Sequence, residues 1–207
     1  FPVHRIYCVG QNYAKHVREM GANPVREAPF FFSKPADAVC TEGCKLPYPM
    51  ATKNLHHEIE LVVAIGKNGT NISEAEALDY VFGYAVGLDL TRRDLQGEAK
   101  KKGRPWTTAK GFDHSAPCSA LHLIDEVGHI KQGKITLSVN GEVRQQGEIA
   151  DMIWSVSEVI SSLSRLFELY PVDLIFTGTT VGLRQLNLGD RLEDVVENLA
   201  KLKITIL

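Results

Sequence analysis

The chain has 207 residues, of which 44% are hydrophobic and 23% are charged, and its formal net charge is −2. This composition is typical of a globular protein with a sizeable core, and it excludes an overall electrostatic attraction to nucleic acid or to an anionic membrane surface. No apolar run approaches the roughly 18 residues of a membrane span, and the first residues do not resemble a secretory signal. We therefore expect an intracellular protein, cytoplasmic or, in a eukaryote, mitochondrial, whose four cysteines are reduced.

The first third of the chain reads as short strands separated by loops. A strand is predicted at 5–10, followed by a two-turn helix at 13–20 that Gly21 ends, a short aromatic strand at 30–32 and a longer apolar strand at 54–65. Ser73 and Glu76 form a capping box that predicts a short helix to about residue 81. The segment "GYAVGLDL" then predicts a buried strand that ends at Asp89, and the polar stretch after it is either a mobile loop or a helix that caps a site.

The second half of the chain continues this pattern. Alternation around Asn140 and Gly141 predicts a hairpin with a type I′ turn. A second capping box at Ser155 opens a helix with one apolar face, made of Val156, Val159, Ile160, Leu163, Leu166 and Phe167. A buried strand at 172–179 and a final hairpin complete the chain. Because these strands do not alternate with long helices, we expect a mixed, mostly antiparallel β-rich α+β fold with a few short packed helices, in one domain over 1–207.

Two glutamates lie unusually in the apolar strand at 54–65. Alternation places Glu58 and Glu60 on one face with Val62 and Ala64, so the face that carries the acids also carries core residues. Two residues advance a strand by about 6.6 Å, which lets both side chains converge on one ion, and Asp89 is a plausible third ligand. Three oxygen ligands favour Mg²⁺, or alternatively Mn²⁺ or Ca²⁺. The alternative is an exposed edge strand that the acids solubilise.

Other polar residues allow weaker interpretations. His16 and Glu19 are one turn apart on the first predicted helix, where a carboxylate orients an imidazole to take a proton from water, or where the pair makes only a surface contact. His56 and His57 are candidate ligands or hydrogen-bonded structural histidines. The "TGTT" segment at 177–180 either presents N–H and hydroxyl groups to a carboxylate ligand or forms an ordinary turn.

The order of several motifs points to a known family. The motifs are "CVGQNYAKHVREMG", "FFFSKP", "HHEIEL", "GYAVGLDLTRRDLQ", "KKKGRPWTTAKGFD", "VNGEVRQQG", "ADMI" and "DLIFTGT". Together they resemble the fumarylacetoacetate hydrolase family, in its short single-domain acylpyruvate hydrolase branch. The resemblance covers nearly the whole chain and implies a β-roll or sandwich fold that assembles as a homodimer.

The resemblance also assigns expected roles. The family's metal motif falls on Glu58, Glu60 and Asp89, its water-activating pair falls on His16 and Glu19, and its lysine falls on Lys110. The substrate-contacting positions that it implies are Gln96 and Thr179, with Arg93 as a further candidate. Gln11, where many relatives have Arg, and Thr180, where many have Pro, depart from the pattern and bear on substrate choice.

The expected activity is hydrolysis of a C–C bond in an acylpyruvate, such as fumarylpyruvate or acetylpyruvate, to pyruvate and a carboxylic acid. In that reaction His16, oriented by Glu19, would activate water, and the metal would stabilise the developing enolate. Two alternatives stay open: oxaloacetate decarboxylation or keto–enol isomerisation at the same metal site, and a β-rich module that only binds a small carboxylate.

Overall fold

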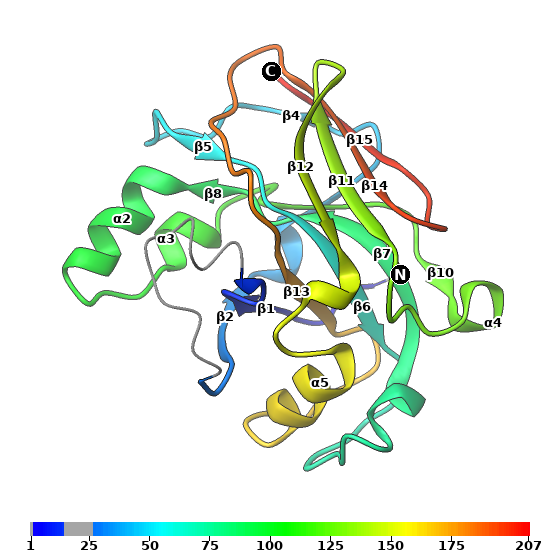
Figure 1. The fold of residues 1–207 in the computed structure, drawn as a ribbon. Coiled ribbons are helices and arrows are strands. Elements are labelled where there is room, and N and C mark those ends of the chain that lie inside the picture. The colour runs from blue at the N-terminus through cyan, green and yellow to red at the C-terminus, as the bar shows by residue number, and fades with distance from the viewer. Residues whose placement is uncertain (1, 15–26) are drawn as a thin grey trace.

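The largest sheet is formed by eight strands within the residues that the computed structural model describes, 2–14 and 27–207 (Figure 1). In spatial order these are β2 (Phe30–Lys34), β1 (Ile6–Gly10), β13 (Leu174–Thr179), β6 (Ile59–Ile65), β7 (Val81–Leu88), β9 (Ala116–Cys118) and β3 (Val39–Thr41), and β10 (His122–Leu123) also pairs with β7. The β1–β13 and β3–β9 pairs are parallel and the other pairs of this sheet are antiparallel. The mixed, mostly antiparallel sheet predicted from the sequence is confirmed.

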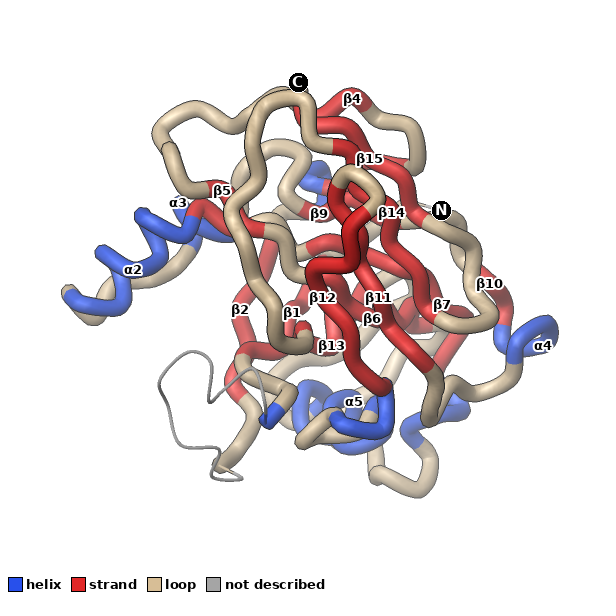
Figure 2. Tube along the Cα trace, turned by 45° about the horizontal axis from the view of Figure 1, so that its top comes forward, coloured by secondary structure: helices blue, strands red, loops and turns tan. Residues whose placement is uncertain are grey.

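The smaller sheet crosses over the larger one (Figure 2). Its order is β12 (Glu142–Glu148), β11 (Lys134–Val139), β14 (Arg191–Val196), β15 (Leu202–Ile206) and β4 (Lys45–Leu46), and β5 (Leu55–His56) pairs separately with β8 (Thr91–Arg92). Asn140 and Gly141 join β11 to β12 with φ angles of 53° and 83°. Two positive φ angles define a type I′ turn, so this predicted hairpin is confirmed, as is the final hairpin of β14 and β15.

The helices are short and lie at the edges of the sheets. They are α2 (Arg93–Lys101), α3 (Thr107–Lys110), α4 (Ile124–Val127) and α5 (Val156–Ser164), with 3₁₀ turns η1 (Ala36–Ala38), η2 (Ala77–Tyr80) and η3 (Ile149–Asp151). The α2 and α3 helices lie beside β5 and β8, away from α5 (Figures 1 and 2). Among the described residues no helix is long and apolar enough to cross a membrane. The predicted helix at 13–20 lies mostly outside the described residues.

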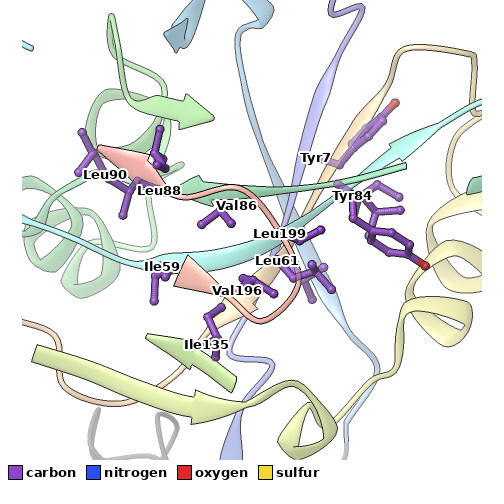
Figure 3. Packing of buried hydrophobic residues seen from close by; sticks show 14 of the residues in the cluster. Tyr7, Ile59, Leu61, Tyr84, Val86, Leu88, Leu90, Ile135, Val196 and Leu199 are labelled. Atoms are coloured by element: carbon purple, nitrogen blue, oxygen red, sulfur yellow. The ribbon is translucent and has the colours of Figure 1, made fainter. Parts of the chain in front are cut away.

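The strand β6 is buried on both faces, which explains its apolar sequence. Ile59 and Leu61 belong to the core cluster between the two sheets, together with Ile135 of β11 (Figure 3). Val62 and Ala64 belong to a second cluster on the opposite face. Because β6 pairs with β13 on one side and β7 on the other, the exposed-edge alternative for the glutamates is wrong.

Three local expectations need correction. The strand predicted at 54–65 is broken between β5 and β6, so Glu58 lies in the connection just before β6. The capping box of Ser155 is present, but α5 ends at Ser164, and Leu166 and Phe167 beyond it are 64% and 42% exposed. The segment after Ser73 forms only the 3₁₀ turn η2.

The expectation of reduced thiols is wrong for one pair of cysteines. Cys40 and Cys44 are joined by a disulfide, and their Cα atoms are 6.2 Å apart. Gly43 between them has a φ of 78°, which allows the chain to turn back at this point. Cys8 and Cys118 are free and buried, as expected. Reduced thiols were expected because the four cysteines show no CxxC spacing, although Cys40 and Cys44 are a close pair in the sequence.

Candidate active site

Three carboxylates meet where β6 and β7 lie side by side. Glu58 precedes β6, Glu60 belongs to it, and Asp89 follows β7 directly. The antiparallel register pairs Ile59 with Leu88, and the Asp89 N–H donates to the Glu58 carbonyl at 2.9 Å, so both acids emerge at one point. Carboxylate oxygens of the three residues lie within 4.8 Å of one another, and all three side chains are buried. The convergence expected from the spacing is present.

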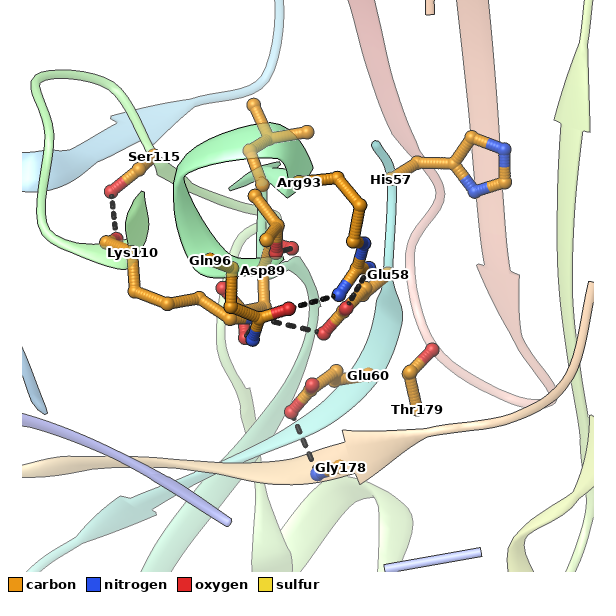
Figure 4. A network of polar contacts seen from close by, with 12 residues as sticks. His57, Glu58, Glu60, Asp89, Arg93, Gln96, Lys110, Ser115, Gly178 and Thr179 are labelled. Atoms are coloured by element: carbon orange, nitrogen blue, oxygen red, sulfur yellow. Dashed lines mark hydrogen bonds and ion pairs between the residues drawn. The ribbon is translucent and has the colours of Figure 1, made fainter. Parts of the chain in front are cut away.

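Buried cations compensate two of these acids. The Lys110 ammonium lies 2.9 Å from Glu58 Oε2 and 2.5 Å from Asp89 Oδ2 (Figure 4). Arg93 forms an ion pair with the other oxygen of Glu58, and Lys34 Nζ lies 2.8 Å from Asp89 Oδ1. Burial alone would lower the pKa of Lys110, but the Asp89 and Glu58 carboxylates outweigh this effect and raise it. Lys110 is therefore held as a cation in the interior.

Glu60 has a different environment from the other two acids. Its Oε2 accepts the Gly178 N–H at 2.7 Å, and among the described residues no cationic side chain pairs with it. Burial raises the pKa of Glu60 well above its usual value, and the nearby Asp89 and Glu58 carboxylates raise it further. Gly178 has a φ of 98°, and a Cβ on it would lie 2.6 Å from the Asn12 Cβ, so only glycine suits this position.

The donor set fits a hard divalent cation. Three carboxylates offer oxygen atoms close together, and oxygen is the ligand atom that Mg²⁺, Mn²⁺ and Ca²⁺ prefer. Glu60 lacks a cationic partner among the described side chains, and a bound divalent ion would provide one. The histidines lie outside this group: His56 Nε2 is hydrogen-bonded to Asn54 and His57 Nδ1 to Gln145, both at 2.8 Å.

A cavity opens beside the carboxylates. The described residues that line it are Val9, Gly10, Gln11, Phe30, Phe32, Glu58, Glu60, Arg93, Gln96, Lys100, Trp106, Lys110 and Thr179. All the residues expected to contact substrate are in this set, which contains no histidine among the described residues. His16 and Glu19, the expected water-activating pair, lie outside the described residues.

All three of the expected substrate contacts already bond to the protein. Arg93 donates to Gln96 Oε1 at 2.6 Å, which directs the amide of this buried glutamine. The Thr179 hydroxyl donates to the Ile59 carbonyl at 2.8 Å and accepts from Gln145 Nε2 at 3.0 Å. The "TGTT" segment thus directs the Gly178 N–H and the hydroxyls of Thr177 and Thr179 toward β6, whereas the Thr180 hydroxyl donates to the Gln146 carbonyl of β12 at 3.4 Å.

Sequence reasoning missed two residues that shape the site. Lys34 is buried at the end of β2 and also donates to the Leu90 carbonyl at 3.1 Å and to the Lys110 carbonyl. The position of Lys34 at the end of an aromatic strand was the one sequence feature that could have indicated its burial at the site. Gln145 is buried in β12 and joins His57 to Thr179, and nothing in its local sequence distinguishes it from Gln146.

Comparison with known proteins agrees with this geometry. The model of the fumarylacetoacetate (FAA) hydrolase C-terminal family matches residues 5–207. The chain belongs to the fumarylacetoacetate hydrolase family. As a member of it, the chain is an enzyme of the class that hydrolyses C–C bonds of ketonic substrates.

Members of this family with different named activities resemble the chain over most of its length. Fumarylpyruvate hydrolase from Pseudomonas aeruginosa, solved in complex with Mn²⁺ and pyruvate, is 51% identical with a TM-score of 0.98, covering 100% of this chain and 91% of that chain. Fumarylpyruvate hydrolase of Ralstonia sp is 42% identical over 87% of this chain and 93% of its own. The mitochondrial oxaloacetate tautomerase FAHD1 of Homo sapiens is 44% identical, over 97% and 90%. The fold expected from the sequence resemblance is confirmed by the solved structure of the Pseudomonas aeruginosa protein.

Proposed function

We propose that the protein is a divalent-metal-dependent hydrolase that cleaves an acylpyruvate, with fumarylpyruvate as the first candidate, to pyruvate and a carboxylic acid. The observation that carries this proposal is the buried cluster of Glu58, Glu60 and Asp89 with Lys110 and Arg93 against it. The similarity to two fumarylpyruvate hydrolases supports it. We also propose that residues 1–207 act as one catalytic domain, because one core cluster spans both sheets.

The three carboxylates would hold the metal, for which Mg²⁺ is the expected ion and Mn²⁺ the ion in the solved relative. When bound, a divalent cation supplies Lewis acidity toward the oxygens of a 2-oxo acid. Lys110 brings an ammonium group to the same place, where it would donate to the oxygen that gains charge as pyruvate leaves as its enolate. Gln96, held by Arg93, would direct its amide N–H groups to the substrate carboxylate.

Thr179 is better suited to positioning than to direct donation, because its hydroxyl proton is already given to the Ile59 carbonyl. It would fix the end of β13, from which Gly178 supports Glu60. His16, oriented by Glu19, is proposed to take a proton from the attacking water. The hydroxide adds to C4, the C3–C4 bond breaks with its electron pair on C3, and protonation of C3 releases pyruvate.

A second candidate function is keto–enol tautomerisation of oxaloacetate, with decarboxylation as a related outcome. It is favoured by the 44% identity to the human oxaloacetate tautomerase. It would use the same carboxylates and Lys110 but would need no activated water. The expected homodimer and the cellular compartment stay predictions.

The test follows loss of dioxo-acid absorbance and release of pyruvate from fumarylpyruvate and acetylpyruvate, with added Mg²⁺ or Mn²⁺ and then with excess EDTA. We expect pyruvate release to depend on the metal. Asp89→Asn and His16→Ala should each lower the rate of pyruvate release by at least about 100-fold. His16→Ala should still bind Mn²⁺ normally in calorimetry. The control is Asp125→Asn, which changes an exposed acid on α4.

Three results would count against the proposal. Cleavage that continues in excess EDTA would show that the reaction does not need the metal. Normal turnover by His16→Ala would show that His16 is not the base. Enol–keto exchange or decarboxylation of oxaloacetate without pyruvate release from either acylpyruvate would favour the second candidate.

A further inference from the structure

One face of α2 forms a wall of the cavity. Arg93, Gln96 and Lys100 follow the i, i+3, i+7 spacing that places side chains on a single helix face, and all three line the cavity. The first two lie next to the carboxylates, where Arg93 pairs with Glu58. Lys100 is one further turn along, about 6 Å beyond Gln96 along the helix axis. Lys100 is therefore attached to α2 about two turns beyond Arg93, which pairs with Glu58.

Lys100 differs from the other cations of the cavity in its partners. Among the described residues, Arg93 and Lys110 each pair with an acid of the cluster, whereas Lys100 pairs with none. Its Nζ lies 5.0 Å from the centroid of the Trp106 ring. Desolvation lowers the pKa of Lys100, and the neighbouring charges of Arg93 and Lys110 lower it further, against the opposing effect of Glu58. An anion bound at this position would be favoured by both cations.

Aromatic rings line the cavity between Lys110, whose Nζ lies 4.9 Å from the Phe32 centroid, and Lys100 beside Trp106. Trp106 meets Phe30 at 5.6 Å with an interplanar angle of 85°, and Phe32 at 5.7 Å with an angle of 57°. All three rings line the cavity, and Phe30 is 39% exposed. Aromatic walls of this kind suit a flat, conjugated group. The cavity thus combines a flat apolar surface with a free-standing positive charge.

We propose that Lys100, together with the rings of Trp106, Phe30 and Phe32, forms a second anion subsite that selects acylpyruvates whose acyl group is flat and ends in a carboxylate. This inference rests on the proposed function, because it assumes that the 2-oxo acid end of the substrate lies at the Glu58–Glu60–Asp89 cluster. The far end then points along α2 toward Lys100. A fumaryl group meets both requirements, and an acetyl group offers neither a conjugated chain nor a second carboxylate.

The kinetic test compares fumarylpyruvate with acetylpyruvate in Lys100→Met and in Lys101→Met. Lys101 is the next residue of α2, is exposed and does not line the cavity, which makes it a matched control. We expect Lys100→Met to lower kcat/KM for fumarylpyruvate about 10- to 100-fold, mainly through KM, and to change that for acetylpyruvate less than about twofold. Lys100→Arg should restore most of the loss because it keeps the charge.

A binding test needs no turnover. Calorimetry on the Mn²⁺-loaded protein compares fumarate with crotonate, in which a methyl group replaces one carboxylate. We expect wild type and Lys101→Met to bind fumarate more tightly, and Lys100→Met to lose this preference. Equal binding of the two acids by wild type, or an equal loss of both activities in Lys100→Met, would overturn the subsite.

The two proposals fail differently. If wild type cleaves neither acylpyruvate but still prefers fumarate through Lys100, the proposed hydrolysis falls and the anion subsite stands. If pyruvate is released from both substrates and Lys100→Met does not change their ratio, the hydrolase stands and the subsite falls.

Discussion

Acidic side chains are buried both at the candidate active site and in the smaller sheet, but their surroundings differ. Glu58 and Asp89 are paired with Lys110, Arg93 and Lys34. Asp194 of β14 is fully buried opposite Leu137 and Leu202, and neither of its carboxylate oxygens has a hydrogen-bond partner among the described residues. Burial raises the pKa of Asp194 well above its usual value, with a further contribution from Glu193.

The difference separates two ways of keeping an acid in a protein interior. At the site, the cations Lys110, Arg93 and Lys34 lie within ion-pair distance of Glu58 or Asp89 and offset the cost of burying their charges. At Asp194 no described residue offers such a partner, so burial disfavours the charged form and costs stability. Removing a compensating cation at the site should lower the free energy of unfolding, whereas removing the acid at Asp194 should raise it.

The largest effect on stability is expected from Lys110→Met. It removes the ammonium that faces both Glu58 and Asp89 and leaves two buried carboxylates without it, so the free energy of unfolding should fall by about 3–5 kcal/mol. Urea unfolding in EDTA measures the loss, and Lys131→Met, at an exposed position, is the control. Added Mn²⁺ should recover part of the stability. A variant as stable as wild type would show that Lys110 does not compensate these acids.

A gain in stability that grows with pH is expected from Asp194→Asn. The raised pKa of Asp194 means that the folded state holds a proton that the unfolded state releases above about pH 4, so wild type loses stability as pH rises from there toward the folded pKa. The variant lacks this loss, and its advantage should grow by up to about 1.4 kcal/mol per pH unit.

Urea unfolding at several values between about pH 5 and pH 8 measures this slope. Asp125→Asn makes the same change at an exposed position of α4 and serves as the control. A constant difference between Asp194→Asn and wild type across this range would contradict the assignment of a neutral Asp194.

The smallest effect is expected from Lys201→Ala. Its ammonium lies 2.7 Å from Glu193 Oε1, a distance similar to those of the buried pairs, but the two side chains are 55% and 41% exposed. Water screens such a pair, so the free energy of unfolding should change by less than about 1 kcal/mol. A loss as large as that of Lys110→Met would show that burial is not what distinguishes the two ion pairs.

Local pattern predicted the elements whose cause is local. The type I′ turn at Asn140 and Gly141, the capping box at Ser155 and the alternation of β6 each depend on neighbours in the chain, and the structure contains all three. The carboxylate cluster could be predicted from the sequence because the spacing of Glu58 and Glu60 agreed with the family motif.

Contacts between residues of distant segments could not be predicted from local patterns. Lys34 reaches Asp89 from β2, and Gln145 reaches His57 from β12, contacts that depend on how the sheets pack. Asp194 is an intermediate case. Alternation in β14 places it inward between Leu192 and Val196, so the pattern indicates its burial but not its lack of a partner.

The candidate metal ligands lie at the central strands, whereas the proposed anion subsite lies on α2 and the loop after it. This separation bears on how the enzyme can diverge from its relatives. The carboxylates lie in or directly beside the buried central strands β6 and β7, where most substitutions disturb the core. Lys100 lies on the short helix α2 and Trp106 on the loop after it, at the edge of the fold, where exchanges cost little stability. Substitutions on α2 and the loop after it can therefore change substrate preference in this family while Glu58, Glu60 and Asp89 stay unchanged.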